Sequence, residues 1–185
     1  MKLFLASKSP RRKELLSSKG FVYTIESKDT DETMDKNLSV YDNVLNVSYK
    51  KALAVSLDHR DDVVLGCDTI VVYDSKIYGK PKSKEDALET LKLLNGKTHS
   101  VISGVAIITP NKEYRFYVES FVTFKNNSLN DLIEYVNTGE PMDKAGSYAI
   151  QGIGSKLIKE YSGSYENIIG LPIDEVSKIL NEVLD

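Results

Sequence analysis

Near its start the chain reads Leu3-Phe4-Leu5-Ala6-Ser7-Lys8-Ser9-Pro10-Arg11-Arg12-Lys13-Glu14-Leu15-Leu16. The apolar residues at its beginning predict a strand, and Ser9 followed by Pro10 predicts the N-cap and first position of a helix. Backbone N–H groups make that helix end positive, so each cationic side chain there costs roughly a few tenths of a kcal/mol until an anion binds. The stretch therefore predicts a binding site for phosphate or another polyanion. The alternative is a solvated amphipathic helix whose arginines point into water.

The composition limits the kind of protein that can carry this binding site. The chain has 185 residues, of which 41% are hydrophobic, so we expect one domain, over residues 1–185, with a sizeable core. The net charge of −3 argues against a nucleic-acid polymer or a membrane surface as partner, because such binders need a broad basic field. No apolar run suits a signal peptide or a membrane span, so a cytoplasmic location is expected. The single Cys67 and the two histidines are interpreted as structural.

Alternating helix and strand patterns predict a single α/β domain with a mixed sheet. Helix starts are predicted at Ser39, Ser83 and Ser128, and a final helix near Pro172. Asp follows three residues after Ser83 and after Ser128, as in a capping box, and Gly96 and Gly139 predict the ends of these two helices. Strands are predicted at Lys2–Ala6, Val63–Tyr73, Ser100–Thr109 and Tyr114–Lys125, the last two as a hairpin around Pro110-Asn111.

Two polar residues, Asp68 and Thr69, interrupt the apolar run from Val63 to Val72. Burying an unpaired carboxylate costs several kcal/mol, so Asp68 should face a partner, a metal or a cleft. Local hydrogen bonding at a strand end is the alternative. Further along, Gly79-Lys80-Pro81 holds a lysine between a permissive and a rigid residue, which suits a phosphate oxygen.

Lys51 lies along the apolar stripe of the helix predicted from Ser39, together with Val40, Val44 and Val47. Either its side chain snorkels from the helix edge, or its ammonium enters a site under the helix. The preceding run Asp29-Thr30-Asp31-Glu32 is either a solvated loop or a source of carboxylate oxygens for a hard divalent cation.

Several familiar motifs are excluded. Gly96-Lys97-Thr98 lacks the earlier glycine of a phosphate-binding P-loop, and Gly152-Ile153-Gly154 lacks the third glycine of a dinucleotide fingerprint. The serines of Ser162-Gly163-Ser164 have no nearby histidine base, so serine-hydrolase chemistry has little support.

Taken together, the motifs resemble the Maf family of nucleoside triphosphate pyrophosphatases over nearly the whole chain. The resemblance rests on Leu5 to Leu16, Asp68-Thr69-Ile70-Val71, Gly79-Lys80-Pro81, His99-Ser100-Val101, Gly139 to Gly152 and Gly170-Leu171-Pro172. It implies a mixed, twisted central sheet flanked by helices, with two lobes and a cleft, as in Maf and inosine triphosphate pyrophosphatase-like proteins. It also implies a homodimer, and hydrolysis of a nucleoside triphosphate to the monophosphate and pyrophosphate with a divalent metal, Mg²⁺ or Mn²⁺.

The resemblance assigns roles to individual residues. It makes Asp68 the proton acceptor for the attacking water, and it gives Glu32 a role in metal binding or water orientation. An ordinary Asp, with a pKa of about 3.9, is a weak base, so Asp68 is expected to act together with a metal. Arg12, Lys51 and Lys80 match the phosphate-binding cations of the family, with Lys80 also counted among the catalytic residues. Ser7 matches a further substrate-binding position.

Three further positions match those that distinguish the dTTP and UTP group of the family from the 7-methyl-GTP group: Arg11, Thr69 and Gln151. The Gln151 amide offers one donor and one acceptor to the O4 and N3–H edge of uracil or thymine, although a flipped amide also suits cytosine. The resemblance therefore favours dTTP and UTP, and we expect a role in clearing modified pyrimidine nucleotides.

Two other classes of function fit the sequence less well. A nucleotide-binding regulator of cell division with little turnover would use Arg11, Arg12 and Lys80, but would have little need for a carboxylate such as Asp68. A single-stranded RNA binder should carry an extended basic and aromatic track, whereas the eleven tyrosines here are scattered.

Overall fold

The computed structural model, which describes residues 1–184, contains a mixed sheet with the strand order β2-β1-β3-β5-β6-β7, and β4 pairs with β3 off this path. The strands are β1 (Leu3–Leu5), β2 (Thr24–Ile25), β3 (Val63–Tyr73), β4 (Lys76–Tyr78), β5 (Thr98–Ile108), β6 (Glu113–Phe124) and β7 (Ile158–Ser162). The α-helices are α1 (Pro10–Ser18), α2 (Val40–Ser56), α3 (Lys84–Leu94), α4 (Leu129–Asn137), α5 (Tyr165–Ile169) and α6 (Ile173–Leu184). Three short 3₁₀ helices are η1 (Glu140–Asp143), η2 (Ala145–Ser147) and η3 (Gly152–Leu157). The mixed α/β class expected from the sequence is confirmed.

The described chain divides into two units. Unit 1 comprises residues 1–69, 103–118 and the C-terminal segment from Gly170, and unit 2 comprises residues 70–102 and 119–169. The long strands β3, β5 and β6 contribute residues to both units.

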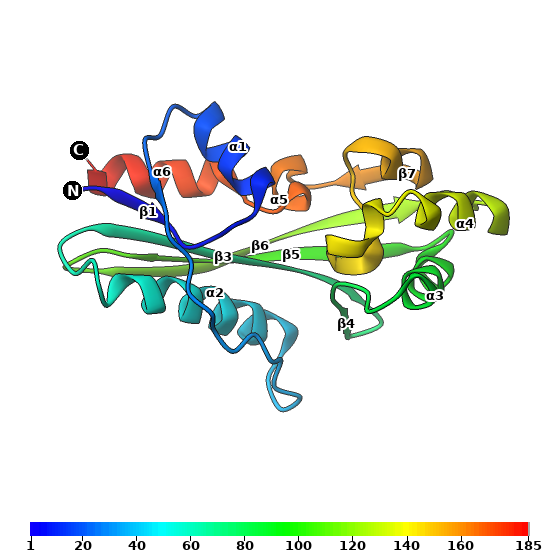
Figure 1. Cartoon of the computed structure of the whole chain (residues 1–185), viewed down its shortest axis with the longest axis horizontal. Helices are drawn as coiled ribbons and strands as arrows, with labels where there is room; N and C mark the ends of the chain where they lie inside the picture. The colour runs from blue at the N-terminus through cyan, green and yellow to red at the C-terminus, as the bar shows by residue number, and fades with distance from the viewer. Residues whose placement is uncertain (185) are drawn as a thin grey trace. The chain divides into compact units, whose positions relative to one another are not determined.

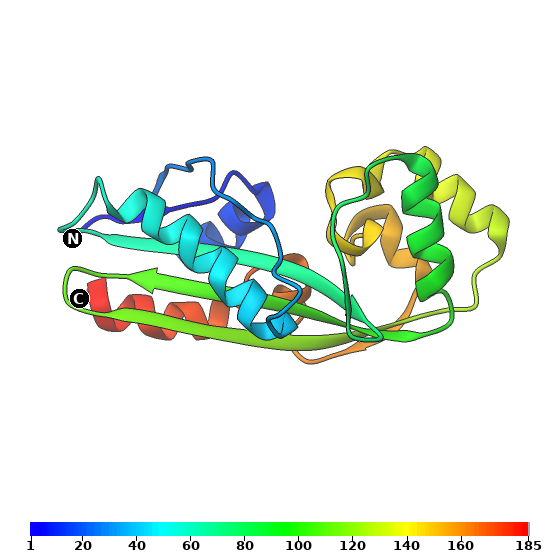
Figure 2. The same cartoon turned by 90° about the horizontal axis from the view of Figure 1, so that it is seen from below.

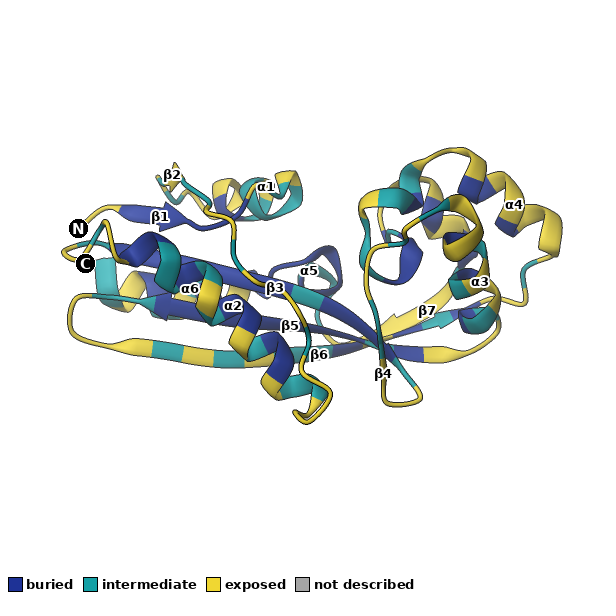
Figure 3. Ribbon diagram, turned by 60° about the horizontal axis from the view of Figure 1, so that its bottom comes forward, coloured by how far each residue is buried: buried dark blue, intermediate teal, exposed yellow. Residues whose placement is uncertain are grey.

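Unit 1 is a three-layer arrangement. Helices α1 and α6 cover one face of its strands and α2 covers the other, as Figure 1 shows. Strand β1 runs parallel to β3, with Leu5 opposite Leu65. The larger core lies on the α1 and α6 side and the smaller one on the α2 side, where Val64 of β3 packs with Ala52 and Val55 of α2. Figure 3 shows β1 and most of β3 and β5 as buried.

Unit 2 contains α3, α4, the 3₁₀ helices, β4, β7 and α5, with α3 and α4 packed side by side (Figure 2). A cluster of buried rings lies in its core. His99 Nε2 hydrogen-bonds to the Tyr148 hydroxyl at 2.7 Å, and Phe124 meets both rings edge-on. Strand β7 pairs antiparallel with β6 and is mostly exposed.

Most of the predicted elements are confirmed. Strand β3 has the predicted bounds, and the turn between β5 and β6 is closed by a bond from the Thr109 N–H to the Lys112 carbonyl. Ser39 and Ser128 both cap their helices through their side chains, and Ser128 forms a complete capping box with Asp131. Within the described chain, the short strands β2, β4 and β7 and the 3₁₀ helices were not predicted, because each is too short for a periodic pattern.

One detail of the predicted caps is wrong. Ser9 occupies the N-cap position of α1 and Pro10 begins the helix, as predicted; the Ser9 side chain makes no capping bond, and the Ser9 N–H donates to the Ser7 hydroxyl. Ser83 caps α3 as predicted, but the Asp86 carboxylate accepts from the Lys82 N–H. The second half of the expected capping box is therefore displaced by one residue.

Within residues 1–184, no helix combines the length and the apolar character needed to cross a bilayer.

The buried ring cluster of unit 2 predicts a loss of stability in acid. Burial lowers the pKa of His99 from 6.5 to about 4, because the apolar core disfavours the charged imidazolium. Between these two values the unfolded chain binds more protons at this residue than the folded chain does, so stability falls as the pH falls from 6.5 to about 4. Lowering the pH from about 7 to about 4.5 should cost about 2 kcal/mol through His99 alone.

Urea unfolding of the wild type and of His99→Gln at both pH values isolates this contribution. Glutamine keeps a polar partner for Tyr148 but does not titrate, so the variant should lose about 2 kcal/mol less on acidification. An equal loss in both proteins would show that other groups account for the acid sensitivity.

Candidate active site

Asp68, Lys51 and Glu32 form a charged cluster in unit 1. Lys51 Nζ lies 2.7 Å from Asp68 Oδ1 and 3.0 Å from Glu32 Oε2. The side chains of Lys51 and Asp68 are only 14% and 13% exposed, whereas Glu32 is largely open to solvent. The partner expected for the Asp68 carboxylate is therefore a lysine. Of the two alternatives for Lys51, the structure shows the second: its ammonium enters a site under α2.

The backbone of α2 approaches β3 closely enough to bring these groups together. A side chain at Gly66 would collide with the Ser48 carbonyl and with Ala52 on α2. Gly66 and Asp68 are two residues apart on an extended strand and so share the face that α2 covers. The missing side chain at Gly66 thus lets Lys51, one turn beyond Ser48, reach Asp68. The neighbouring Lys50 points elsewhere and pairs with Asp31 at 3.6 Å.

Arg12 is held by oxygen atoms that carry no net charge. Its Nε donates to the Gly170 carbonyl at 2.9 Å, and its two terminal nitrogens donate to the hydroxyls of Ser7 and Thr69, both at 3.2 Å. These bonds fix the plane of the guanidinium without neutralising its charge. The arrangement suits an anion, as the sequence predicted for the start of α1.

Two residues outside the predicted set support this arginine. The Gly170 carbonyl also accepts from the Thr69 hydroxyl at 3.3 Å and from the Cys67 thiol at 3.4 Å. Ser103, a fully buried residue of β5, shares a 2.8 Å hydrogen bond with the Thr69 hydroxyl. The available sequence signal for Gly170 was its place in the Gly170-Leu171-Pro172 motif. Its φ of +135° is one that glycine adopts readily.

Cys67 is a structural residue of this site. Its side chain is buried in the core on the α1 and α6 side, and burial raises the pKa of its thiol. A thiol in such an environment is a poor nucleophile. The structure therefore supports the structural interpretation of Cys67.

Two successive residues of β3 contact the charged cluster and Arg12. Asp68 faces α2, and Thr69, whose side chain points to the other face, binds Arg12. Ser7 follows the carboxyl end of β1, which runs parallel to β3. In α/β sheets, ligands bind outside the carboxyl ends of parallel strands, so the position of both groups suits a bound ligand.

The remaining predicted residues are distributed between the two units. Arg11 lies in the first turn of α1, beside Arg12 and half-buried. Lys80 and Gln151 belong to unit 2 and are both exposed. Lys80 follows Gly79, whose carbonyl accepts from the Gly146 N–H at 3.2 Å. Gln151 stands immediately before η3.

The donor atoms near Lys51 are those that a hard divalent cation prefers. Asp68 and Glu32 both offer carboxylate oxygens within 3.0 Å of the same nitrogen. No cluster of three or more His, Cys, Asp or Glu side chains that could hold a metal occurs among residues 1–184. The site is thus compatible with Mg²⁺ or Mn²⁺ only where a substrate supplies further oxygens.

The fold and this site define an α/β protein that presents a carboxylate–lysine cluster and a fixed arginine for an anionic ligand. A family model described as Maf-like protein matches residues 2–183, and the chain belongs to the Maf family. The dTTP/UTP pyrophosphatase of Bacillus pumilus (strain SAFR-032) is 44% identical over 178 residues, covering 96% of this chain and 94% of that protein. A protein of the same name from Bacillus anthracis (strain CDC 684 / NRRL 3495) is 45% identical over 181 residues, covering 98% and 95%.

A solved structure, that of the Staphylococcus aureus Ham1 protein, has a similar fold. The TM-score is 0.53 with 14% sequence identity, over 98% of this chain and 99% of that chain. The expected family and fold are confirmed.

Proposed function

We propose that this protein hydrolyses dTTP and UTP to the nucleoside monophosphate and pyrophosphate. The observation that carries the proposal is the buried Asp68 carboxylate, bound to Lys51 and one residue from the Thr69 that fixes Arg12. The names of relatives that are about 45% identical over nearly the whole chain support the substrate class.

In the proposed reaction, Asp68 accepts a proton from a water molecule as the water oxygen attacks the α-phosphorus. The bond between that phosphorus and the bridging oxygen breaks, and pyrophosphate leaves with the bond electrons. Lys51 orients Asp68 through the 2.7 Å bond and carries positive charge beside the phosphates. General-base catalysis of this kind accelerates a reaction by about 10² to 10⁴.

The cations bind the substrate. A triphosphate carries several negative charges, and more charge develops on the pyrophosphate as it leaves. Arg12 offers a planar donor fixed by Gly170, Ser7 and Thr69. Arg11 and Lys80 add charge, and in this proposal Lys80 contacts the leaving group.

Asp68 and Glu32 would hold a divalent metal, Mg²⁺ or Mn²⁺, together with phosphate oxygens of the substrate. When bound, the metal supplies charge neutralisation and lowers the pKa of a coordinated water. The same two carboxylates hold Lys51 between them. Lys51 thus keeps them close together before a substrate arrives.

Removal of divalent cations is expected to abolish turnover. Two protein carboxylates are a weak metal site on their own, so EDTA should strip the ion easily, and Mg²⁺ or Mn²⁺ should restore activity. Pyrophosphate release from UTP is measured before and after EDTA treatment and after each metal is added back. Undiminished turnover in excess EDTA would contradict a role for the metal.

Substrate choice is tested by comparing kcat/KM for dTTP, UTP, 5-modified UTP, CTP, ATP, GTP and 7-methyl-GTP. The proposal predicts that thymine and uracil nucleotides are the best substrates, because the Gln151 amide pairs with their O4 and N3–H groups. Clearing of modified pyrimidine nucleotides requires that 5-modified UTP is turned over faster than ATP or GTP. Equal rates for all bases would refute the assignment of Gln151.

The cytoplasmic location and the homodimer expected from the sequence remain part of this proposal. Light scattering of the purified protein measures its mass in solution, and a mass equal to that of one chain would remove the homodimer from the account.

A further inference from the structure

The backbone around Gln151 has an unusual cap. Gln151 is the N-cap residue of η3 and has extended backbone angles, but its own side chain makes no capping bond. An N-cap residue usually uses its side chain to accept from the first N–H groups of the helix. Here the amide of Gln151 is exposed and is not consumed by its own helix.

The missing cap is supplied by Glu140 of η1. Its Oε1 accepts from the Ile153 N–H at 3.1 Å, and its Oε2 accepts from the Gly154 N–H at 2.8 Å. Both oxygens of one carboxylate are therefore used on two successive backbone donors. Bonds to an ionised acceptor are about twice as strong as those between neutral groups.

Gly152 leaves room for the Glu140 carboxylate. Its φ is +70°, and a side chain added there would collide with Glu140 Oε1. Glycine is thus favoured at this residue for its backbone angle, and a side chain there would displace the Glu140 carboxylate from its present position. The backbone between Gln151 and Ile153 is fitted to Glu140.

The segment is also fixed before Gln151. The Ala149 N–H donates to the Tyr135 hydroxyl at 3.2 Å, and Tyr135 is buried in α4. Burial, followed by the contact with Glu140, raises the pKa of the Tyr135 hydroxyl, so this group stays protonated. Tyr135 and Glu140 therefore form one hydrogen-bonded unit that holds the chain on both sides of Gln151.

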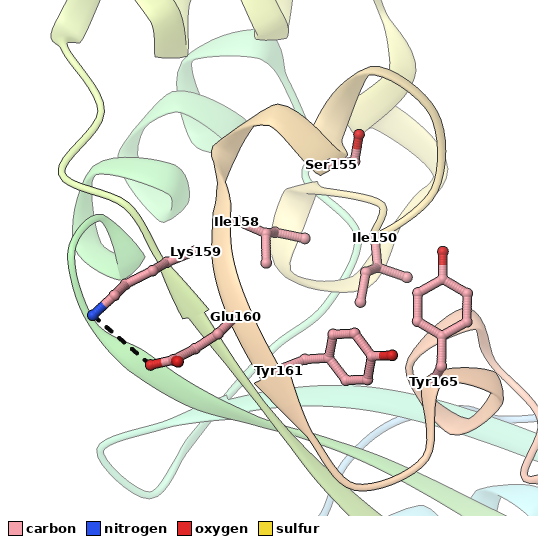
Figure 4. Close-up of a pocket in the computed structure, with 7 residues that line it drawn as sticks. All are labelled: Ile150, Ser155, Ile158, Lys159, Glu160, Tyr161 and Tyr165. Carbon is pink, nitrogen blue, oxygen red and sulfur yellow. Dashed lines mark ion pairs between the residues drawn. The ribbon is translucent and has the colours of Figure 1, made fainter.

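A third anchor is apolar. Ile150 is buried, and its side chain lines a hollow of about 390 Å³ together with Tyr161 and Tyr165 (Figure 4). Ile150 thus points into unit 2, while the next residue, Gln151, is exposed. The anchors at residues 149, 150, 153 and 154 thus lie on both sides of Gln151, and the Gly152 carbonyl accepts from the Ser155 hydroxyl at 2.7 Å.

We propose that Glu140 is a positioning residue for base recognition, which caps η3 in place of Gln151 and holds the Gln151 amide ready for the pyrimidine edge of the substrate. This inference rests on the proposed function, because it assigns Gln151 to the base. Glu140 itself touches neither the substrate nor the reacting atoms.

The test variant is Glu140→Gln, which keeps the size of the side chain but replaces one acceptor oxygen by an NH₂ donor. One of the two backbone N–H groups then loses its acceptor. We expect the ratio of kcat/KM for UTP to that for ATP to fall about tenfold, mainly through the KM for UTP. The matched control is Glu134→Gln on α4, an exposed glutamate that accepts from Asn130 at 2.8 Å.

Two measurements on the free protein make the result independent of turnover. Amide hydrogen exchange at Ile153 and Gly154 should be about tenfold faster in Glu140→Gln than in the wild type and in Glu134→Gln. Equilibrium binding of UTP and of ATP should show the same fall in the ratio of affinities.

Each outcome decides the matter. Unchanged exchange would show that Glu140 does not hold this backbone, and faster exchange with an unchanged UTP to ATP ratio would show that the cap does not serve base recognition; either result overturns the inference. If the wild type hydrolyses neither nucleotide, the proposed function fails, and the ratio of binding affinities still supports or overturns the role of Glu140.

Discussion

Replacing Asp68 by asparagine should lower kcat for UTP about a thousandfold while the protein still binds the nucleotide. Asparagine has almost the same shape but cannot accept a proton from water, so the chemical step loses its base. Asparagine is also a weaker ligand for the metal, but the removal of one negative charge beside the triphosphate offsets this loss, so UTP should still bind at saturating Mg²⁺. Single-turnover kinetics and equilibrium binding of UTP measure the two effects separately.

The matched control for this variant is Asp58→Asn. Asp58 is exposed and pairs with Lys28, so the same chemical change occurs there outside the cluster of Asp68, Lys51 and Glu32. The control should retain wild-type kcat. If the Asp68→Asn variant stays folded and its kcat is within tenfold of the wild-type value, Asp68 is not the general base.

Replacing Arg12 by lysine should lower kcat/KM for UTP about a hundredfold, although the charge is conserved. The guanidinium is oriented by three acceptors at once: the Gly170 carbonyl and the hydroxyls of Ser7 and Thr69. An ammonium group cannot reproduce that planar set of donors, so the phosphate contact loses its fixed direction. We expect most of the loss in KM, measured by steady-state kinetics with UTP.

Arg60→Lys is the control for this substitution. Arg60 is exposed, and its Nε lies 3.5 Å from the Leu57 carbonyl in the same unit. Its replacement should leave both kinetic constants unchanged. If Arg12→Lys also behaved like the wild type, charge alone would be sufficient at this position, and the orientation by Gly170 would have no function.

Much of the fold could be predicted because its signals are local. The bounds of β3 follow from one apolar run, and the starts of α2 and α4 follow from serines that cap their own helices. The apolar stripe of α2 left two alternatives for Lys51, at the helix edge or under the helix, and the structure shows that Lys51, and not Lys50, meets Asp68. Side-chain periodicity and capping depend only on neighbours within a few residues.

The supports of the site could not be predicted, because they join segments that are distant in sequence. Gly170 acts through a backbone carbonyl that receives Arg12, 158 residues away, and every residue type has such a carbonyl. Glu140 acts on two backbone N–H groups, and the donors again carry no side-chain signature. The bond from Arg12 to the Ser7 hydroxyl likewise depends on how the loop after β1 places both residues, and no side-chain pattern marks it.

The most direct test of the account is to follow UTP with Mg²⁺ by phosphorus NMR and to identify the products, with the Asp68→Asn variant measured in parallel. The account predicts UMP and pyrophosphate from the wild type, in equal amounts, and almost no turnover by the variant. Formation of UDP and inorganic phosphate would contradict attack at the α-phosphorus. Binding of UTP without any product, with Mg²⁺ or with Mn²⁺, would instead favour a nucleotide-binding regulator.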